Sequence, residues 1–253
     1  KLIIRIANPI LVNNWRLFST DPGLKIGRLD LMLMRYANLV ILYKKEHLKI
    51  LYKKFNIKNS LLIRNYFPQK KSLKKRVQKK YNIAFVGRLV ENKDPIFFLE
   101  NCLRLNKNLY SKIFIIGSGP LLKDLKIISR KHSHKVKFIK FIKDPFKSFH
   151  NKINLFCLTS KYDGTPNVLG EAISYKIPCL APKNVGCSNE LLDIGKGGEL
   201  YRLGDKDNFL SKINLIFKNY NKAIKKADKA YKGLNKYNKI NTLDKLENKI
   251  YKI

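Results

Sequence analysis

Short apolar runs and amphipathic segments alternate regularly over most of the chain, from residue 81 to residue 201. Runs of four to seven apolar residues bounded by Gly, Pro or polar turns are typical of buried parallel strands, and the segments between them have helical spacing. This pattern predicts an α/β domain with a doubly wound parallel sheet and helices on both faces. The expected strands are 83–86, 113–116, 136–142, 153–158, 178–181 and 199–201, and the expected helices are 95–105, 121–129, 145–150, 166–175 and 188–192.

The first 65 residues have a shorter version of the same alternation. We expect strands at 2–6, 38–43 and 61–64 and helices at 27–36 and 45–55, with an irregular stretch from Pro9 to Gly23. Three strands and two helices are the tail of a parallel α/β domain and too few for a whole one. Because the chain begins at Lys1 without an initiator Met, we take it for a fragment. The expected domains are 1–75, 76–205 and a set of lysine-rich amphipathic helices at 206–253.

Basic residues dominate the charge of the chain. Lys and Arg number 53 against 18 Asp and Glu, which gives a formal net charge of +35. Such a surface is attracted to phosphates of nucleic acid, lipid head groups or small molecules, but Lys is spread through the whole sequence, which favours compositional drift. The basic stretch 68–80 has little apolar periodicity, so we interpret it as an inter-domain linker, with a nucleic-acid arm as the alternative.

The cysteines and the hydropathy limit the class of protein further. Cys102, Cys157, Cys179 and Cys187 are far apart with no Cys-x-x-Cys pair, and two of them lie in apolar strand-like runs. This arrangement predicts reduced thiols and neither a disulfide framework nor a zinc site. No apolar run reaches the roughly 18 residues of a spanning helix, so we expect any membrane contact to be peripheral.

Two strand ends carry residues suited to phosphate binding. Strand 83–86 ends at Gly87 and Arg88, with Lys93 just before a helix; Arg supplies a planar fork and Lys a point charge for a diphosphate. The alternative is that both cations are ordinary surface residues. The next strand ends in a Gly-Ser-Gly-Pro turn in which Gly119 can let a phosphate approach the backbone, although the same turn is common without a ligand.

The most informative stretch is 160–172, with the sequence SKYDGTPNVLGEA. Thr165 can cap the following helix and Pro166 can occupy its first turn. The free N–H groups at the helix start, which belong to Asn167, Val168 and Leu169, then form a cradle for an anion.

Helical spacing separates this helix into an apolar stripe and a polar face. Val168, Leu169, Ala172 and Ile173 form the stripe, whereas the polar face carries Asn167, Glu171 and Ser174. Asp163 lies in the preceding loop, so two carboxylates can approach one ligand and accept hydrogen bonds from sugar hydroxyls. The alternative is a surface Asp with a salt-bridged Glu.

Together these motifs resemble family 4 of the retaining glycosyltransferases with the GT-B fold, in which two Rossmann-like doubly wound domains face each other; here the first would be incomplete. The resemblance covers residues 81–201 and, more loosely, the segment before them. It implies that Arg88 and Lys93 hold the donor's pyrophosphate. Asp163 through Glu171 resembles the family's Glu-x(7)-Glu signature, which implies that Asp163 contacts the transferred sugar and Glu171 the nucleotide ribose.

The sequence departs from the family pattern at two positions. Asp163 replaces the usual Glu and is shorter by one methylene, and Lys140 stands where Gly is common, at the strand end where relatives seat the nucleobase. Residues 36–65 resemble the closing part of the family's acceptor domain. The strand end at Arg5 and Asn8 resembles the one that faces the reacting sugar.

The resemblance implies a co-substrate and partners but no cofactor. The donor would be a UDP- or GDP-linked sugar and the acceptor a lipid-linked or saccharide hydroxyl, in cell-envelope synthesis at the inner face of the cytoplasmic membrane. We expect no metal, since electrostatic stabilisation of the leaving diphosphate would not require one, and no specific nucleic acid. Two alternatives remain at this stage: a basic nucleic-acid-binding protein, and a truncated, inactive transferase remnant.

Overall fold

A computed structural model describes residues 2–5, 10–13, 16–19, 25–26, 28–42, 45–63, 65–70, 79–237 and 239–251. Two compact units make up the chain. Unit 1 comprises Lys1–Phe67, Tyr162–Pro166 and Lys236–Ile253, and unit 2 comprises Pro68–Lys161 and Asn167–Asn235. The domain boundaries expected from the sequence, 1–75, 76–205 and 206–253, stay predictions.

Unit 2 contains a six-stranded parallel sheet in the order β12-β11-β10-β7-β8-β9. Apolar residues fill the strands because helices cover both faces of a parallel sheet. The strand order reverses between β7 and β10, which are neighbours in the sheet but far apart in sequence. The prediction of a doubly wound sheet is confirmed, with strands β7 (Tyr81–Val86), β8 (Tyr110–Ile116), β9 (Val136–Ile139), β10 (Leu155–Cys157), β11 (Cys179–Pro182) and β12 (Glu199–Tyr201).

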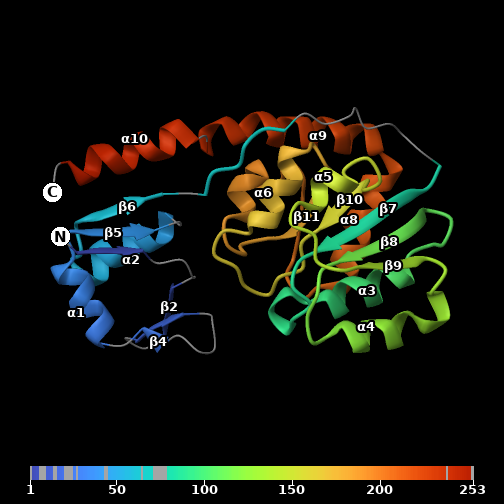
Figure 1. The fold of residues 1–253 in the computed structure, drawn as a ribbon, viewed down its shortest axis with the longest axis horizontal. Helices are drawn as coiled ribbons and strands as arrows, with labels where there is room; N and C mark the ends of the chain where they lie inside the picture. Colours follow the sequence, from blue (N-terminus) through green and yellow to red (C-terminus); the bar gives the residue numbers. More distant parts are fainter. Residues whose placement is uncertain are drawn as a thin grey trace. The chain divides into compact units, whose positions relative to one another are not determined.

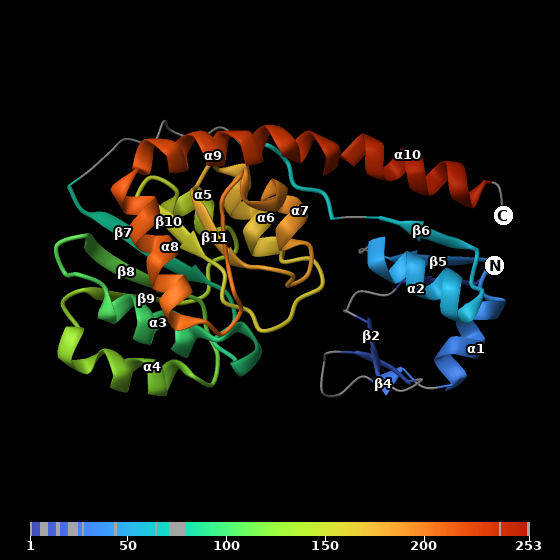
Figure 2. The same cartoon turned by 180° about the vertical axis from the view of Figure 1, so that it is seen from behind.

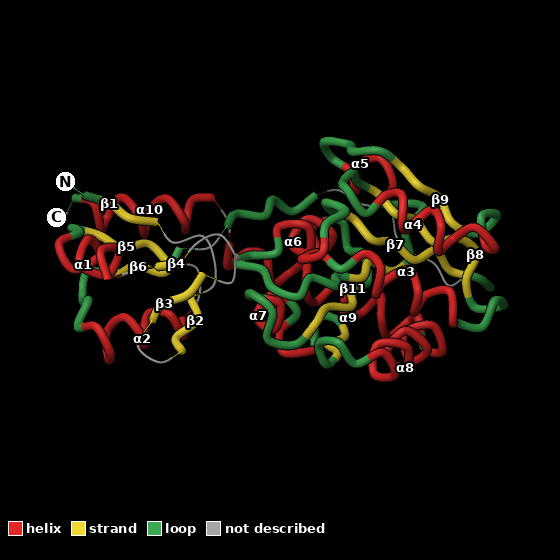
Figure 3. Tube along the Cα trace, turned by 90° about the horizontal axis from the view of Figure 1, so that it is seen from below, coloured by secondary structure: helices red, strands yellow, loops and turns green. Residues whose placement is uncertain are grey.

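Helices connect these strands and form the outer layers of unit 2. Helices α3 and α4 lie side by side along the sheet (Figure 1), and α8 packs on α3 and β12. Helix α6 contacts β11, α7 and α9 (Figure 2), and Figure 3 shows the strands of this unit gathered between helices. The helices are α3 (Pro95–Arg104), α4 (Leu122–Ser129), α5 (Pro145–Phe149), α6 (Asn167–Ser174), α7 (Ser188–Leu191), α8 (Lys206–Lys218) and α9 (Tyr220–Gly233), with short 3-10 segments at Glu91–Lys93, Arg130–His132, Asp193–Gly195 and Leu234–Tyr237.

Aromatic side chains join the helices of unit 2 to the sheet. Tyr81 at the start of β7 stacks on Phe217 at 4.7 Å and lies 4.4 Å from the ring of Tyr220. The rings of Phe97 and Phe209 are 5.2 Å apart, in α3 and α8 respectively. Burial of such rings removes large apolar areas from water, which fixes α8 on the face that α3 covers.

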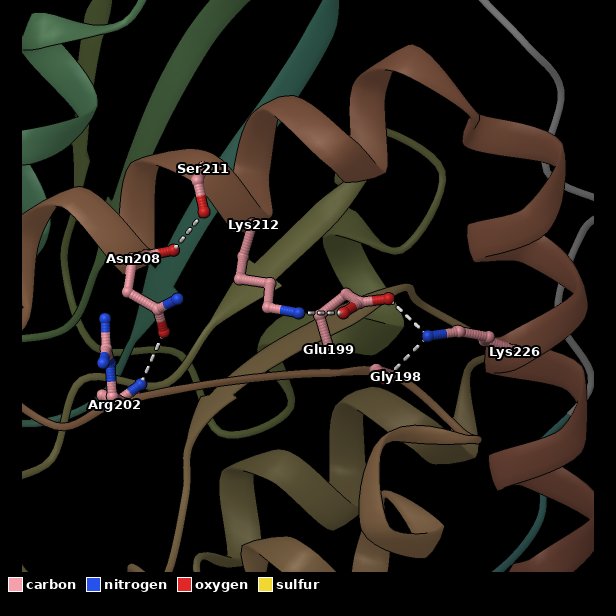
Figure 4. A network of polar contacts seen from close by, with 7 residues as sticks. All are labelled: Gly198, Glu199, Arg202, Asn208, Ser211, Lys212 and Lys226. Atoms are coloured by element: carbon pink, nitrogen blue, oxygen red, sulfur yellow. Dashed lines mark hydrogen bonds and ion pairs between the residues drawn. The ribbon is translucent and has the colours of Figure 1, made fainter.

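A charged network joins β12 to α8 and α9 (Figure 4). The carboxylate of Glu199 accepts from Lys212 of α8 at 3.1 Å and from Lys226 of α9. Asn208 accepts a hydrogen bond from the N–H of Arg202 at 2.8 Å and, through its own carbonyl, one from Ser211 at 3.2 Å. Both C-terminal helices of the unit are therefore held on the last strand.

Unit 1 contains a three-stranded parallel sheet with the order β1-β5-β6 and a separate antiparallel sheet, β2-β3-β4. The parallel strands and helices follow the sequence prediction closely. The antiparallel sheet contradicts the irregular stretch expected from Pro9 to Gly23, since Ile10 pairs with Ser19 and Asn13 with Arg16. The strands are β1 (Ile3–Arg5), β2 (Ile10–Asn13), β3 (Arg16–Ser19), β4 (Lys25–Ile26), β5 (Leu39–Leu42) and β6 (Ser60–Leu62), and the helices are α1 (Arg28–Tyr36), α2 (Lys45–Phe55) and α10 (Lys239–Ile250).

The prediction of an irregular stretch was wrong because it gave more weight to the polar and turn-forming residues than to the apolar residues that pair across the two strands. Only two residues separate β2 from β3, which is the connection length of a tight hairpin. The segments Ile10–Asn13 and Arg16–Ser19 also contain β-branched and aromatic residues that favour strands.

The structure also describes the surroundings of the cysteines and the apolar character of the helices. All four cysteines are buried and none of them forms a disulfide, and burial raises the pKa of the Cys102 and Cys157 thiols well above the ordinary range. In the described parts of the chain, no helix has both the length and the apolar character needed to cross a membrane.

The described part of the expected linker is held against unit 2. The N–H of Lys70 donates to the carbonyl of Ser174 at 3.1 Å, and the side chain of Gln69 donates to the carbonyl of Tyr231 at 2.8 Å. Most of the basic stretch, residues 71–78, lies outside the described residues.

Candidate functional site

The loops that follow β7 and β10 lie at the place where the strand order of unit 2 reverses. In open parallel sheets, ligands bind beyond the carboxyl ends of the strands at such a switch point. The loop after β7 carries Gly87, Arg88 and Lys93, and the loop after β10 leads through Thr159 and Lys161 to α6. Sequence positions 66 residues apart therefore meet at one edge of the sheet.

Hydrogen bonds tie these two loops together. The hydroxyl of Thr159 donates to the carbonyl of Lys93 at 2.9 Å and to that of Asp94 at 3.1 Å. The N–H of Lys161 donates to the carbonyl of Asn92 at 2.8 Å. Thr159 and Ser160 are each only 1% exposed, and the hydroxyl of Ser160 has no hydrogen-bond partner within the described residues.

Asp94 ends the loop and begins α3. It has left-handed backbone angles, φ 49° and ψ 53°, and its carboxylate accepts from the N–H of Phe97 at 3.2 Å, with Pro95 in the first turn. An Asp cap followed by Pro is a strong helix start. The half-buried Lys93 is therefore fixed in backbone position, while the side chain of Arg88 is exposed.

The glycines after β8 pack against the loop that carries Arg88. A Cβ atom on Gly117 would lie 1.9 Å from the carbonyl oxygen of Gly87, and one on Gly119 would lie 2.4 Å from that of Leu89. The N–H of Leu89 donates to the carbonyl of Ser118 at 2.8 Å. Gly119 thus has a structural reason to be glycine, and its contact with a phosphate stays a prediction.

Helix α6 starts at Asn167, so Pro166 stands one position before the helix instead of inside its first turn. Asn167 and Glu171 are exposed, as the helical spacing predicts. The prediction was wrong for Ser174, which is 3% exposed and whose hydroxyl donates to the carbonyl of Glu171 at 2.7 Å. A small hydroxyl that bonds to the preceding turn can be buried without leaving its donor unpaired.

The carboxyl of Glu171 lies in an environment that disfavours its charged form. Although Glu171 as a whole residue is exposed, neighbouring protein atoms displace part of the water around its carboxyl and raise the pKa of Glu171, and the negative charge of Asp144 raises it further. Asp144 caps α5 by accepting from the N–H of Lys147 at 3.0 Å, and its second oxygen accepts from the hydroxyl of Tyr175 at 3.3 Å. The ring of His150 stacks on Tyr175 at 5.2 Å.

The remaining predicted residues lie in other parts of the structure. Asp163 belongs to the segment Tyr162–Pro166, which groups with unit 1, so its approach to Glu171 stays a prediction. Arg5 is the last residue of β1, and the structure describes its backbone alone. Asn8 lies outside the described residues. Within the described residues of the whole chain, no group of three or more His, Cys, Asp or Glu side chains is arranged to hold a metal ion.

Sequence reasoning missed the residues that assemble the site. Thr159 donates to the loop after β7, which is distant in sequence, and Asp94 and Asp144 cap the starts of α3 and α5. The Asp-Pro pairs at 94–95 and 144–145 are visible as helix starts, because an acidic cap followed by Pro is their usual pattern. Nothing in the sequence signals the bond from Thr159 to Lys93.

Comparison with known proteins identifies related sequences. The family model described as Glycosyl transferases group 1 matches residues 67–233. GalNAc-alpha-(1->4)-GalNAc-alpha-(1->3)-diNAcBac-PP-undecaprenol alpha-1,4-N-acetyl-D-galactosaminyltransferase of Campylobacter jejuni is 27% identical over 176 residues, which cover 68% of this chain and 49% of that protein. UDP-Gal:alpha-D-GlcNAc-diphosphoundecaprenol alpha-1,3-galactosyltransferase of Escherichia coli is 25% identical over 169 residues, covering 65% and 43%. The chain thus spans about half the length of the curated relatives it matches.

Solved structures share the fold at low sequence identity. HepE of Anabaena, in complex with UDP, has a TM-score of 0.80 and 16% identity, with 100% of this chain and 72% of that chain covered. The pneumococcal O-GlcNAc transferase GtfA, in complex with UDP and GlcNAc, has a TM-score of 0.80 and 14% identity, with coverages of 99% and 52%. The α/β fold of the GT-B type, expected from the sequence, is confirmed.

Proposed function

The chain belongs to the glycosyl transferases group 1 family, and we propose that it transfers a sugar from a nucleoside-diphosphate sugar to an acceptor hydroxyl with retention of the anomeric configuration. The observation that carries this proposal is the bond from Thr159 to the carbonyls of Lys93 and Asp94. It joins the loop with the candidate diphosphate ligands to the loop that leads into α6, at the switch point of the sheet.

In this proposal the donor diphosphate lies between Arg88, Lys93 and the start of α6. The two cations supply charge-assisted hydrogen bonds, and the backbone N–H groups of Asn167, Val168 and Leu169 lie at the positive end of the helix dipole. Gly87 and Gly119 keep the neighbouring backbone free of side chains.

The two carboxylates have separate roles. Glu171 accepts hydrogen bonds from the ribose hydroxyls, and Asp163 accepts them from the transferred sugar. Pro166 stands immediately before α6 and leaves no N–H of its own at that position.

The chemistry is electrostatic. When the bond between the anomeric carbon and the diphosphate breaks, negative charge grows on the leaving diphosphate, and Arg88, Lys93 and the start of α6 stabilise it. This stabilisation requires neither a side-chain nucleophile nor a metal ion.

The names of the relatives support a class of donor and acceptor. The E. coli relative is named for UDP-Gal and a diphosphoundecaprenol acceptor, and the C. jejuni relative for an undecaprenol-linked saccharide. We therefore propose a UDP-linked donor, with GDP as the alternative, and a lipid-linked or saccharide acceptor in cell-envelope synthesis at the cytoplasmic face of the membrane.

Binding of nucleotide to the purified chain tests the site. Isothermal titration with UDP and with GDP should identify the base. Arg88→Ala and Lys93→Ala should each weaken binding of the preferred nucleotide by about 10- to 100-fold, the effect of a lost hydrogen bond to a charged group. Arg104→Ala, at an exposed position on α3, is the matched control and should bind as the parent does. Unchanged binding by Arg88→Ala would contradict the assigned site.

The two carboxylates can be separated by the choice of ligand. Glu171→Gln should weaken binding of both UDP and the UDP-sugar, because both contain the ribose. Asp163→Asn should leave UDP binding unchanged and reduce only the affinity for the UDP-sugar and its hydrolysis. If Asp163→Asn weakens UDP binding as much as Glu171→Gln does, the sugar contact is assigned to the wrong residue.

A further inference from the structure

Helix α9 has one buried face and one basic face. Tyr220, Ala223, Ala227 and Ala230 are each less than a tenth exposed and pack inward. Four lysines recur at spacings of three, four and three residues, which places them on one side of a helix. These residues, Lys222, Lys225, Lys229 and Lys232, are all exposed and are called here the basic face of α9.

The loop between α7 and β12 packs beside this face. The carboxylate of Asp193 pairs with Lys229 at 3.1 Å. A Cβ atom on Gly197 would lie 2.9 Å from the Cβ of Ala230, so the backbone of the loop lies directly against α9. This loop therefore continues the surface that the basic face of α9 begins.

The tip of the loop is an exposed apolar residue with an unusual backbone. Ile194 is 76% exposed and has left-handed angles, φ 50° and ψ 43°. A β-branched residue rarely adopts this conformation, because its side chain crowds its own backbone. Asn or Gly would fit better, so the structure keeps an apolar side chain in water at a position that disfavours it.

The charge of the combined surface is positive. Lys196 adds a fifth exposed lysine from the loop. The acids within the surface are Asp193, paired with Lys229, and Asp228, paired with Lys232 at 3.0 Å and with Lys176 at 2.8 Å. The basic face of α9 with the loop thus keeps an excess of positive charge beside an exposed apolar tip.

We propose that this surface docks unit 2 on an anionic lipid bilayer, with the lysines against the head groups and Ile194 inserted among them. Basic residues near an anionic leaflet are attracted to it, and an apolar side chain adds burial that charge alone does not provide. Docking of this kind is separate from the sugar-transfer chemistry, and it uses none of the residues proposed to bind the donor.

The apolar tip favours a membrane over nucleic acid as the partner. Phosphates of RNA would attract the same lysines, but a duplex or single strand gains little from an isolated aliphatic side chain, since bases stack on aromatic rings. Ile194 therefore separates the two partners experimentally.

Vesicle co-sedimentation of the purified chain provides the test, with phosphatidylglycerol mixed into phosphatidylcholine and with phosphatidylcholine alone. Lys222→Gln combined with Lys225→Gln should lower partitioning onto the anionic vesicles by about 25-fold, at roughly fivefold for each lysine near the surface. Lys123→Gln combined with Lys126→Gln is the matched control, because these exposed lysines of α4 have the same spacing. It should change partitioning little.

The apolar contribution has its own matched pair. Ile194→Asn should fold at least as well as the parent, since Asn tolerates left-handed angles, and should reduce vesicle binding severalfold. Ile127→Asn, at a position 72% exposed on α4, should leave vesicle binding unchanged.

Three results would overturn the proposal. The first is equal loss of binding in the α9 and α4 lysine pairs, which would show attraction to net charge without a defined surface. The second is unchanged vesicle binding of Ile194→Asn. The third is a gel shift of RNA that the α9 lysine pair abolishes while vesicle binding persists, which would assign the surface to nucleic acid.

Discussion

The hydroxyl of Thr159 lies 2.9 Å from the carbonyl oxygen of Lys93 and donates a hydrogen bond to it. A second contact, 3.1 Å to the carbonyl of Asp94, uses the same hydroxyl. One buried side chain thus connects the loops after β7 and β10. These two strands are neighbours, and the strand order of the sheet reverses between them. The backbone at Lys93 is therefore held by a side chain 66 positions later in the sequence.

Replacement of Thr159 by Val should test this connection. Val has the same shape but no hydroxyl, so the variant loses the bonds to both carbonyls and should lose about 1–3 kcal/mol of unfolding free energy. Urea denaturation measures the change, and nucleotide titration should show weaker binding through a displaced Lys93. Thr159→Ser keeps the hydroxyl and should restore the nucleotide affinity; a Ser variant that binds as weakly as Val would argue against the hydrogen bond as the cause.

The glycines after β8 yield a prediction about packing. In Gly119→Ala, the new Cβ would lie 2.4 Å from the carbonyl oxygen and 2.7 Å from the carbonyl carbon of Leu89, both backbone atoms that cannot rotate away. The loop after β7 would have to shift, at a cost of about 3 kcal/mol in stability. Thermal unfolding measures this loss. Gly233→Ala, where nothing lies within 4 Å of the added atom, is the control and should leave the unfolding midpoint unchanged or raised.

Most of the fold could be predicted from the sequence because each element of unit 2 has a local signal. Apolar runs such as residues 83–86, each followed by a segment with helical spacing, indicate buried parallel strands joined by helices. The hairpin in unit 1 could not be predicted in this way. Its strands are short, and the residues around them, such as Pro9 and Asn13, are also typical of irregular loops.

The candidate site was predictable only where chemistry and local structure coincide. Arg88, Lys93 and Glu171 stand out because charged residues follow a strand end or share a polar helix face. Thr159 was missed because its importance comes from a contact between loops about 65 residues apart. The burial of Ser174 was not predicted because helical spacing gives the side of the helix on which a residue lies and not how far neighbouring elements cover that side.

The environment of Glu171 predicts how nucleotide binding depends on pH. Ribose hydroxyls donate to the carboxylate form, so binding should weaken as the pH falls through the pKa of Glu171. Because partial loss of water around the carboxyl and the charge of Asp144 raise that pKa, the loss should begin at a higher pH than for an ordinary Glu. Asp144→Asn removes the negative charge and should move the loss to lower pH.

Asn suits this experiment because it preserves the structural role of Asp144. Asn caps helices as well as Asp does, and when its oxygen accepts from the N–H of Lys147, its NH2 group can donate to the hydroxyl of Tyr175. Nucleotide affinity is measured by titration calorimetry from about pH 4 to pH 8, a range that spans the ordinary Glu pKa. Tyr175→Phe, which removes the hydroxyl and keeps Asp144, should shift the pH profile much less. Identical profiles for the parent and Asp144→Asn would remove Asp144 as a cause of the raised pKa.

The network around Glu199 predicts how α8 and α9 are held. In Glu199→Gln, two ammonium groups that are only 29% and 21% exposed would lose their shared negative partner. Partly buried charges without a partner are costly, so the unfolding free energy should fall by about 2 kcal/mol, and amide exchange should accelerate in both helices. Arg202→Gln breaks the pair between Arg202, 75% exposed, and Asp205, and should cost under about 1 kcal/mol, since solvent screens exposed pairs. If both variants lose the same stability, the attachment of α8 and α9 rests on their apolar contacts with the sheet and not on the carboxylate between them.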